Sequence, residues 1–216
     1  AIRNIRKTGI RALSIDEGDE LISAVLTDGQ RNMLLATRDG YAICFDENDV
    51  RPMGRDAVGV RGIKLREGDR VVGAAPALSG AQVLSITENG YGKRTAVGEY
   101  LRGGEEAGPQ KRGGMGLKSY NVTDKTGPVA DVRMVKGEED VLIVADDGTI
   151  IRTNVSGVSV LGRATQGVRI MRPNEGAKVI SAALTEPEDE DEPASDEAAD
   201  AAEDAAGSAE APKEGE

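Results

Sequence analysis

A block of about fifty residues recurs along this 216-residue chain, and this repeat limits what the chain can fold into more than any single residue does. Its first marker is a glycine followed by an aliphatic residue and a cation. The marker glycines lie 53, 54 and 51 residues apart, at Gly9, Gly62, Gly116 and Gly167. A second marker, an Asx-Gly pair, occurs out of step with the first, at Asp39-Gly40, Asn89-Gly90 and Asp147-Gly148. A repeat of this length built from strands indicates a propeller-like array rather than one globular core.

Short apolar runs flank each Asx-Gly pair, and this pattern predicts β-hairpins. A type I′ turn needs positive φ at both central residues, so Asx-Gly between apolar runs is a strong hairpin signal. We therefore expect strands at Leu21–Leu26, Met33–Thr37, Tyr41–Phe45, Val71–Ala75, Val83–Thr87, Tyr91–Val97, Val129–Val135, Val141–Ala145, Thr149–Thr153 and Val179–Leu184. The chain holds 28 glycines, which interrupt the apolar patterns before a long helix can form.

The sequence thus predicts an all-β fold over residues 1–185, with about three complete four-stranded blades. Residues 1–20 would be the end of an earlier blade. Propellers usually need about 4–8 blades to close a ring, and three and a fraction do not close one. Because the chain also starts in mid-repeat, at Ala1, we expect it to be the C-terminal piece of a longer polypeptide. A small open sheet domain is the alternative.

The charge of the chain is divided between a body and a tail. The net charge is −11, but residues 186–216 hold 14 acidic side chains and one base, which leaves 26 bases against 24 acids in residues 1–185. This asymmetry favours contact between the body and nucleic acid. Residues 186–216 hold too little apolar surface to offset the entropy of ordering, so we expect a disordered acidic tail. It would either only solubilise the chain or compete with DNA for the basic surface of the body.

Several classes of function are excluded by composition. Without histidine, and with Cys44 as the single cysteine, neither a zinc site nor a Cys–His or Ser-His-Asp nucleophile can be built. Cys44 lies in a strand-like run and is expected to be buried; the lack of a possible internal disulfide fits a reducing cytoplasm. No apolar stretch approaches ~20 residues, so none is long enough to span a membrane. No phosphate-binding or dinucleotide fingerprint is present.

The basic residues recur at matching phases of the repeat and are the candidate binding residues. One set is Arg61, Lys64, Lys111, Arg112, Lys118, Arg163 and Arg169, and the other is Arg51, Arg55, Lys93, Arg94 and Arg152. Units placed around an axis would set each group out as a spaced band. Such a band suits the phosphates of duplex DNA, bent or wrapped, with little sequence preference. Aromatic residues make up 2% of the chain and tryptophan is absent, which argues against a base-stacking platform.

Four motifs make the chain resemble the C-terminal domain of the bacterial DNA gyrase A subunit. They are residues 87–95 (Thr-Glu-Asn-Gly-Tyr-Gly-Lys-Arg-Thr), 49–55 (Asp-Val-Arg-Pro-Met-Gly-Arg), 59–65 (Gly-Val-Arg-Gly-Ile-Lys-Leu) and 162–168 (Gly-Arg-Ala-Thr-Gln-Gly-Val). An acidic tail follows in that family too. The resemblance covers residues 1–185 and implies a six-bladed β-pinwheel that wraps duplex DNA around a basic perimeter.

The resemblance also implies a role and partners. In that family the wrapped DNA is presented to the gate of a type IIA topoisomerase, and ATP-driven strand passage introduces negative supercoils. The gyrase B subunit would join through the missing N-terminal region to form an A2B2 heterotetramer, which implies ATP and Mg for the rest of the enzyme and no cofactor in this chain. A bacterial cytoplasmic location, with the nucleoid, would follow.

The chain departs from the family pattern in two ways. The wrapping motif Gln-Arg-Arg-Gly-Gly-Lys-Gly belongs to the first blade, which is missing here; residues 110–116 resemble it but carry Lys111 and Met115 at its second and sixth positions, as in a degenerate copy. The nucleophilic tyrosine lies in an N-terminal domain outside this chain. None of the tyrosines is a candidate for it, so this piece carries no catalytic residue: Tyr41, Tyr91, Tyr100 and Tyr120.

Two alternatives remain open from sequence. The chain resembles the related topoisomerase IV A subunit less closely, because residues 90–94 and the acidic tail favour gyrase. A protein-binding propeller, in which each cation is a solvated side chain, is the alternative from another class. An enzyme acting alone is disfavoured, since nothing places a pair of carboxylates in a cleft.

Overall fold

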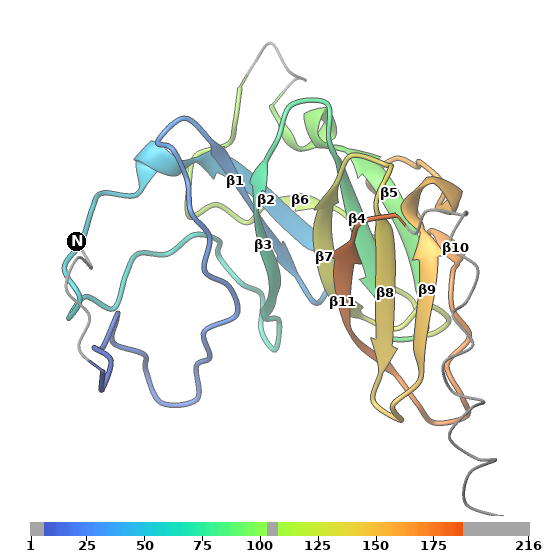
Figure 1. Cartoon of the computed structure of the whole chain (residues 1–216). Helices are drawn as coiled ribbons and strands as arrows, with labels where there is room; N and C mark the ends of the chain where they lie inside the picture. The colour runs from blue at the N-terminus through green and yellow to red at the C-terminus, as the bar shows by residue number, and fades with distance from the viewer. Residues whose placement is uncertain (1–6, 103–107, 188–216) are drawn as a thin grey trace, which may run out of the picture.

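The structure is a computed structural model that describes residues 7–102 and 108–187. Its elements in chain order are β1 (Asn32–Thr37), β2 (Tyr41–Asp46), η1 (Glu47–Asp49), β3 (Val71–Ala77), β4 (Gln82–Thr87), β5 (Tyr91–Ala96), η2 (Val97–Tyr100), β6 (Leu117–Lys118), β7 (Val129–Val135), β8 (Asp140–Ala145), β9 (Ile150–Asn154), η4 (Val155–Gly157), β10 (Val168–Arg169) and β11 (Val179–Thr185). They form three antiparallel sheets, with strand orders β3-β1-β2-β6, β10-β5-β4-β7 and β11-β8-β9 (Figure 1). The all-β prediction is confirmed.

Each sheet is built from one hairpin and from strands that follow later in the chain. The hairpins β1–β2, β4–β5 and β8–β9 turn at the three Asx-Gly pairs. Each hairpin receives an inner strand from the next repeat: β3, β7 or β11. The outer strands β6 and β10 come from farther along the chain and pair with β2 and β5. Every repeat therefore completes the sheet of the repeat before it.

The glycines at two of the Asx-Gly turns contact the backbone of the segments that carry the outer strands β6 and β10. The carbonyl oxygen of Gly90 (φ 76°) accepts hydrogen bonds from the backbone N–H groups of Ile170 and Met171. A Cβ atom on Gly90 would overlap the carbonyl oxygen of Met171, and one on Gly40 would lie 2.6 Å from the carbonyl oxygen of Tyr120. Only glycine tolerates both the positive φ and this approach of another backbone.

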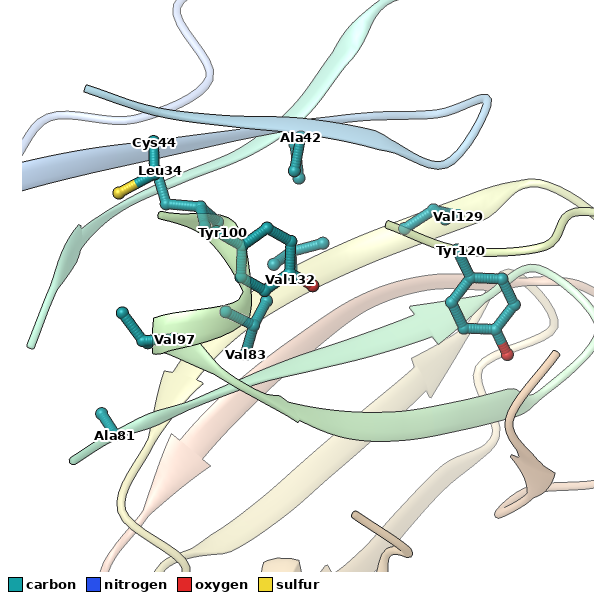
Figure 2. Close-up of a cluster of buried hydrophobic side chains, with 11 residues drawn as sticks. Leu34, Ala42, Cys44, Ala81, Val83, Val97, Tyr100, Tyr120, Val129 and Val132 are labelled. Atoms are coloured by element: carbon teal, nitrogen blue, oxygen red, sulfur yellow. The ribbon is translucent and has the colours of Figure 1, made fainter. Parts of the chain in front are cut away.

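Two apolar cores lie between successive sheets. In Figure 2, Leu34 and Ala42 of the first sheet lie across from Val83 and Val132 of the second, beside the fully buried ring of Tyr100. The second core joins the other face of β4, including Leu84 and Ile86, to Ile143, Val179 and their neighbours in the third sheet. Because β4 is covered on both faces, its sequence is a nearly continuous apolar run rather than an alternating one.

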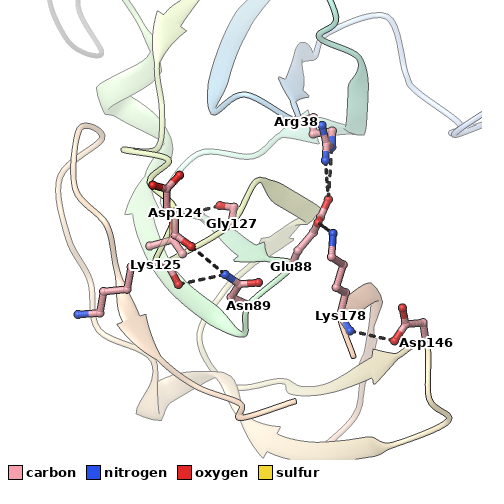
Figure 3. Close-up of polar contacts among 9 residues, drawn as sticks. Arg38, Glu88, Asn89, Asp124, Lys125, Gly127, Asp146 and Lys178 are labelled. Atoms are coloured by element: carbon pink, nitrogen blue, oxygen red, sulfur yellow. Dashed lines mark hydrogen bonds and ion pairs between the residues drawn. The ribbon is translucent and has the colours of Figure 1, made fainter. Parts of the chain in front are cut away.

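Glu88 links all three sheets near their turns (Figure 3). One carboxylate oxygen accepts from Nη2 of Arg38 at 3.0 Å, in the turn between β1 and β2, and the other accepts from Nζ of Lys178 at 2.8 Å, just before β11. Burial raises the pKa of Glu88, but the hydrogen bonds from Lys178 and Arg38 outweigh burial and hold that pKa below its usual value. This ion pair network supplements the apolar contacts between the sheets.

Two details of the predicted architecture are wrong, and both follow from the strand exchange. No strand forms at Leu21–Leu26, and Leu26 is 99% exposed. Its place in the repeat is that of an inner strand, which pairs with the hairpin of the preceding repeat, and the described residues before it contain no such hairpin. The third sheet has three strands, since within the described residues no outer strand pairs with β9. The assignment of residues 1–20 to the end of an earlier blade stays a prediction; residues 7–20 form no strand.

The division at residue 185 stays a prediction, and residues 188–216 of the predicted acidic tail lie outside the described residues. In the part of the chain that the structure describes, no helix is long and apolar enough to cross a membrane.

Replacing Gly90 by alanine should destabilise the fold more than the same change at Gly148. Both residues occupy the same turn position with positive φ, but a Cβ on Gly148 meets nothing within 4 Å. The strain of positive φ alone costs about 1–2 kcal/mol, so Gly148→Ala should lower the free energy of unfolding by that amount and Gly90→Ala by at least twice as much. Urea unfolding measures both, and equal losses would contradict the close backbone approach.

Candidate nucleic-acid interface

The segments that cross between repeats bring cations together from distant parts of the chain. The backbone N–H of Lys64 donates to the carbonyl oxygen of Gly114 at 2.8 Å, and that of Gly113 donates to Gly62 at 2.7 Å. These bonds place residues 61–64 beside residues 111–114. We define the rim cluster as the exposed cations on these two segments and on the β6 strand that follows: Arg61, Lys64, Lys111 and Lys118.

Six of the predicted cations are exposed and, among the described residues, form no ion pair with a carboxylate: Arg51, Arg55, Arg61, Lys64, Lys118 and Arg169. Lys118 lies on β6 opposite Tyr41, and Arg169 lies on β10 opposite Tyr91. The two cations therefore occupy matching places on the outermost strands of two successive sheets. Both belong to the first set of cations that the repeat phase predicted, and their contact with DNA stays a prediction.

Three other predicted cations have acidic neighbours. Nζ of Lys111 lies 3.6 Å from Asp49, although the lysine side chain is 89% exposed. Nε of Arg152 is 2.8 Å from Asp140, and its Nη2 donates to the carbonyl oxygen of Glu186. Arg163 is half-buried, with Nε 3.9 Å from Glu99. A partner carboxylate weakens the attraction of such a cation for phosphate, and most for the less exposed pair.

Lys93 lies inside the protein and not on its surface. The residue is 0% exposed, and its Nζ donates to the carbonyl oxygens of Gly162, at 2.6 Å, and Arg163. Burial, reinforced by the nearby charge of Arg163 and opposed by Glu99, lowers the pKa of Lys93 to about 8. A buried ammonium on two backbone carbonyls has no donor left facing solvent, so the structure removes Lys93 from the candidate phosphate contacts.

Two further predicted cations bind the backbone of a crossing segment. Arg94 donates through Nε to the carbonyl oxygen of Val158 at 2.7 Å and through Nη2 to that of Ser156 at 2.9 Å. Arg112 donates through Nε to the backbone carbonyl oxygen of Asp49 at 3.1 Å and through Nη1 to that of Arg61 at 2.5 Å. Both side chains are half-buried. Their first role is to hold the exchanged segments, because each satisfies carbonyl groups that the short outer strands leave unpaired.

Sequence reasoning missed two cations that lie over tyrosine rings. The guanidinium carbon of Arg66 lies 3.1 Å from the centroid of the Tyr41 ring, and Nζ of Lys125 lies 5.4 Å from that of Tyr91. Arg66 corresponds to Tyr120 and Met171 in the later repeats, so a search for cations at matching phases passes over it. The sequence signal that could have pointed to these cations is the tyrosine after the Asx-Gly turn, which is present in two of the three repeats.

The sequence model of the protein family "DNA gyrase C-terminal domain, beta-propeller" matches this chain in four blocks, at residues 1–28, 31–77, 81–136 and 139–186. The chain belongs to this family. It is 45% identical over 190 residues to the DNA gyrase A subunit of Staphylococcus aureus strain NCTC 8325, a match that covers 87% of this chain and 21% of the relative. The DNA gyrase A subunit of Staphylococcus epidermidis is 44% identical over 188 residues, covering 86% of this chain and 20% of that protein. The chain thus spans about a fifth of the length of these curated relatives.

Two solved structures share the fold. A DNA gyrase A C-terminal domain superposes with a TM-score of 0.73 at 27% identity, over 82% of this chain and 58% of that one. The C-terminal domain of a DNA topoisomerase IV superposes with a TM-score of 0.78 over 87% of this chain and 57% of that one. Its identity of 22% shows the fold alone. Membership of the gyrase family therefore rests on the sequence matches.

The burial of Lys93 predicts a pH dependence with a definite sign. Its pKa is about 8 in the folded domain against 10.5 in the unfolded chain, so between these values the unfolded chain binds more protons. The stability of this domain, measured against a Lys93→Met variant, should therefore rise between pH 8 and 10.5, by up to about 3 kcal/mol. Urea unfolding of both proteins over this range measures the difference. A flat or falling difference would mean that the carbonyl groups favour the ammonium enough to cancel burial.

Proposed function

We propose that this chain is the DNA-wrapping part of a gyrase A subunit, which binds duplex DNA largely without sequence preference. The observation that carries the proposal is a pair of exposed cations at matching places on β6 and β10, Lys118 and Arg169. Within the described residues neither forms an ion pair with a carboxylate, and the other cations of the rim cluster lie on the segments that precede β6 or pair with them. Cations spaced along the outer strands of a curved array follow a bent phosphate backbone, where affinity comes from counterion release.

The rest of the enzyme follows from the family and forms part of the proposal. Wrapped DNA would be passed through the gate by the catalytic core, with ATP and Mg used outside this chain, to introduce negative supercoils. The gyrase B subunit would join the longer gyrase A polypeptide in an A2B2 heterotetramer in the bacterial cytoplasm. The 45% identity to gyrase A relatives favours gyrase over topoisomerase IV. A supercoiling assay of the enzyme that contains this chain separates the two, since only gyrase introduces negative supercoils.

Removing one exposed rim cation should reduce DNA binding without changing sequence preference. Arg61→Ala or Lys64→Ala should lower the slope of log affinity against log salt by ~1 for each lost phosphate contact. The matched control is Arg133→Ala, which removes the same charge from the inner strand β7, where Arg133 lies 2.7 Å from Asp131. Fluorescence anisotropy with two unrelated duplexes measures the slopes. Binding that is independent of salt, or lost for one duplex only, would contradict wrapping by phosphate contacts and favour a protein-binding propeller.

Removing the acidic tail should strengthen DNA binding at low salt. The tail carries 14 acids and one base, and its first residue, Glu186, is held beside β9 by Arg152. Residues 1–185 alone should bind a duplex more tightly than the full chain, with the difference shrinking as salt screens the repulsion. The control is a full-length chain in which the five acids at 188–192 are replaced by their amides. Equal affinity of all three proteins would leave the tail with no competing role.

A further inference from the structure

Two tyrosine rings next to the outer strands lie against cations, and neither tyrosine has a catalytic or phosphate-binding role in the proposed function. Tyr41 and Tyr91 occupy the same place in successive repeats, directly after the Asx-Gly turn, and the third repeat has Thr149 there. Each ring belongs to the strand that pairs with an outer strand: Tyr41 lies opposite Lys118 and Tyr91 opposite Arg169. The two tyrosines are thus at the edge where the proposed DNA path runs.

Each ring carries a guanidinium, although the two arginines come from different phases of the repeat. The guanidinium carbon of Arg66 lies 3.1 Å from the centroid of Tyr41, and that of Arg169 lies 4.9 Å from the centroid of Tyr91. Nη2 of Arg169 also donates to the phenolic oxygen of Tyr91 at 2.5 Å. Within the described residues, neither arginine forms an ion pair with a carboxylate.

We infer that Tyr41 is a positioning residue: its ring holds the Arg66 guanidinium at the edge of the sheet, ready to bind a phosphate. Tyr91 holds Arg169 through its hydroxyl group as well as its ring. This inference rests on the proposed function and adds residues to that site. A guanidinium lying on a ring keeps the N–H groups along its edge directed away from the ring, where they match the two oxygens of a phosphate. Within the described residues, the Arg66 side chain donates one hydrogen bond, from Nη1 to the carbonyl oxygen of Met115. At 3.4 Å this bond is long, and it leaves most of the donors of the guanidinium for a ligand.

The ring of Tyr41 contributes by lowering the entropy that the arginine side chain loses when DNA binds. An arginine side chain loses considerable rotamer freedom when it is fixed on a phosphate. When the ring already restricts that freedom, less is lost at the moment of binding and the complex is tighter. Tyr91 is buried in its sheet, so its truncation would disturb packing. Tyr41 is half-exposed and is the residue on which the inference can be tested.

A double-mutant cycle on Tyr41 and Arg66 tests the inference, with duplex DNA of mixed sequence as the probe. Arg66→Ala should weaken binding and lower the salt slope by ~1, because a phosphate contact is lost. Tyr41→Leu should weaken binding about two- to fivefold, the range expected for an exposed cation–π contact. Tyr41→Phe keeps the ring face and should bind like the unmodified chain. In the Arg66→Ala background, Tyr41→Leu should have no further effect.

A second measurement separates positioning from a general loss of structure. In the absence of DNA, the NMR order parameter of the Arg66 Nε–Hε group should fall in Tyr41→Leu and stay high in Tyr41→Phe, while the urea midpoints of the two variants agree. Additive losses in the cycle, or equal losses for leucine and phenylalanine, would overturn the positioning role while leaving DNA binding intact. If the unmodified chain shows no salt-dependent duplex binding, the proposed function fails, and the phosphate role of Arg66 with it.

Discussion

The close backbone contact between a turn glycine and a segment from a later repeat is the constraint on which the rest of this structure depends. Each hairpin is completed by strands that arrive from farther along the chain. At Gly90 the arriving backbone comes so near that any side chain would overlap it. The two glycine markers of the sequence repeat mark the two sides of this exchange: Gly90 receives Met171, and a Cβ atom on Gly167 would lie 2.5 Å from the carbonyl oxygen of Gly92.

The exchange also decides what the cations do. A two-residue outer strand satisfies few of the carbonyl groups in the segment that carries it, and buried carbonyl groups need donors. Between the second and third repeats, Lys93, Arg94 and Thr95 of β5 donate to carbonyl oxygens of residues 156–163. The motif Gly-Lys-Arg-Thr at residues 92–95 therefore holds the second and third repeats together through side-chain hydrogen bonds to the backbone. Cations counted from composition as available for DNA are partly engaged in holding the fold.

The sequence predicted the strands well because alternation and turn chemistry are local. It placed a strand at Leu21–Leu26 wrongly because pairing is not local: an inner strand needs the hairpin of the preceding repeat. The candidate site was predicted less well for a related reason. Repeat phase identifies equivalent positions, but it does not say whether a side chain at that position points into a core or out of it. Lys93 and Arg94 were therefore placed in one set with the exposed Arg51 and Arg55, and Arg66, which has no basic counterpart at its phase, was passed over.

The first and second sheets differ in which side of the strand exchange donates hydrogen bonds to the backbone carbonyl groups. In the first sheet, the positions equivalent to Lys93 and Thr95 hold Ile43 and Phe45, which pack on Ile63. Here Arg112, on the arriving segment itself, donates to the backbone. In the second sheet the donors come from the receiving strand β5, and Arg163, the counterpart of Arg112 on the arriving segment, lies 3.9 Å from Glu99. In both sheets the cation on the outer strand, Lys118 or Arg169, stays exposed. Strand exchange thus decides which cations are bound to backbone carbonyl groups and which stay exposed as candidate DNA contacts, and net charge alone does not distinguish the two.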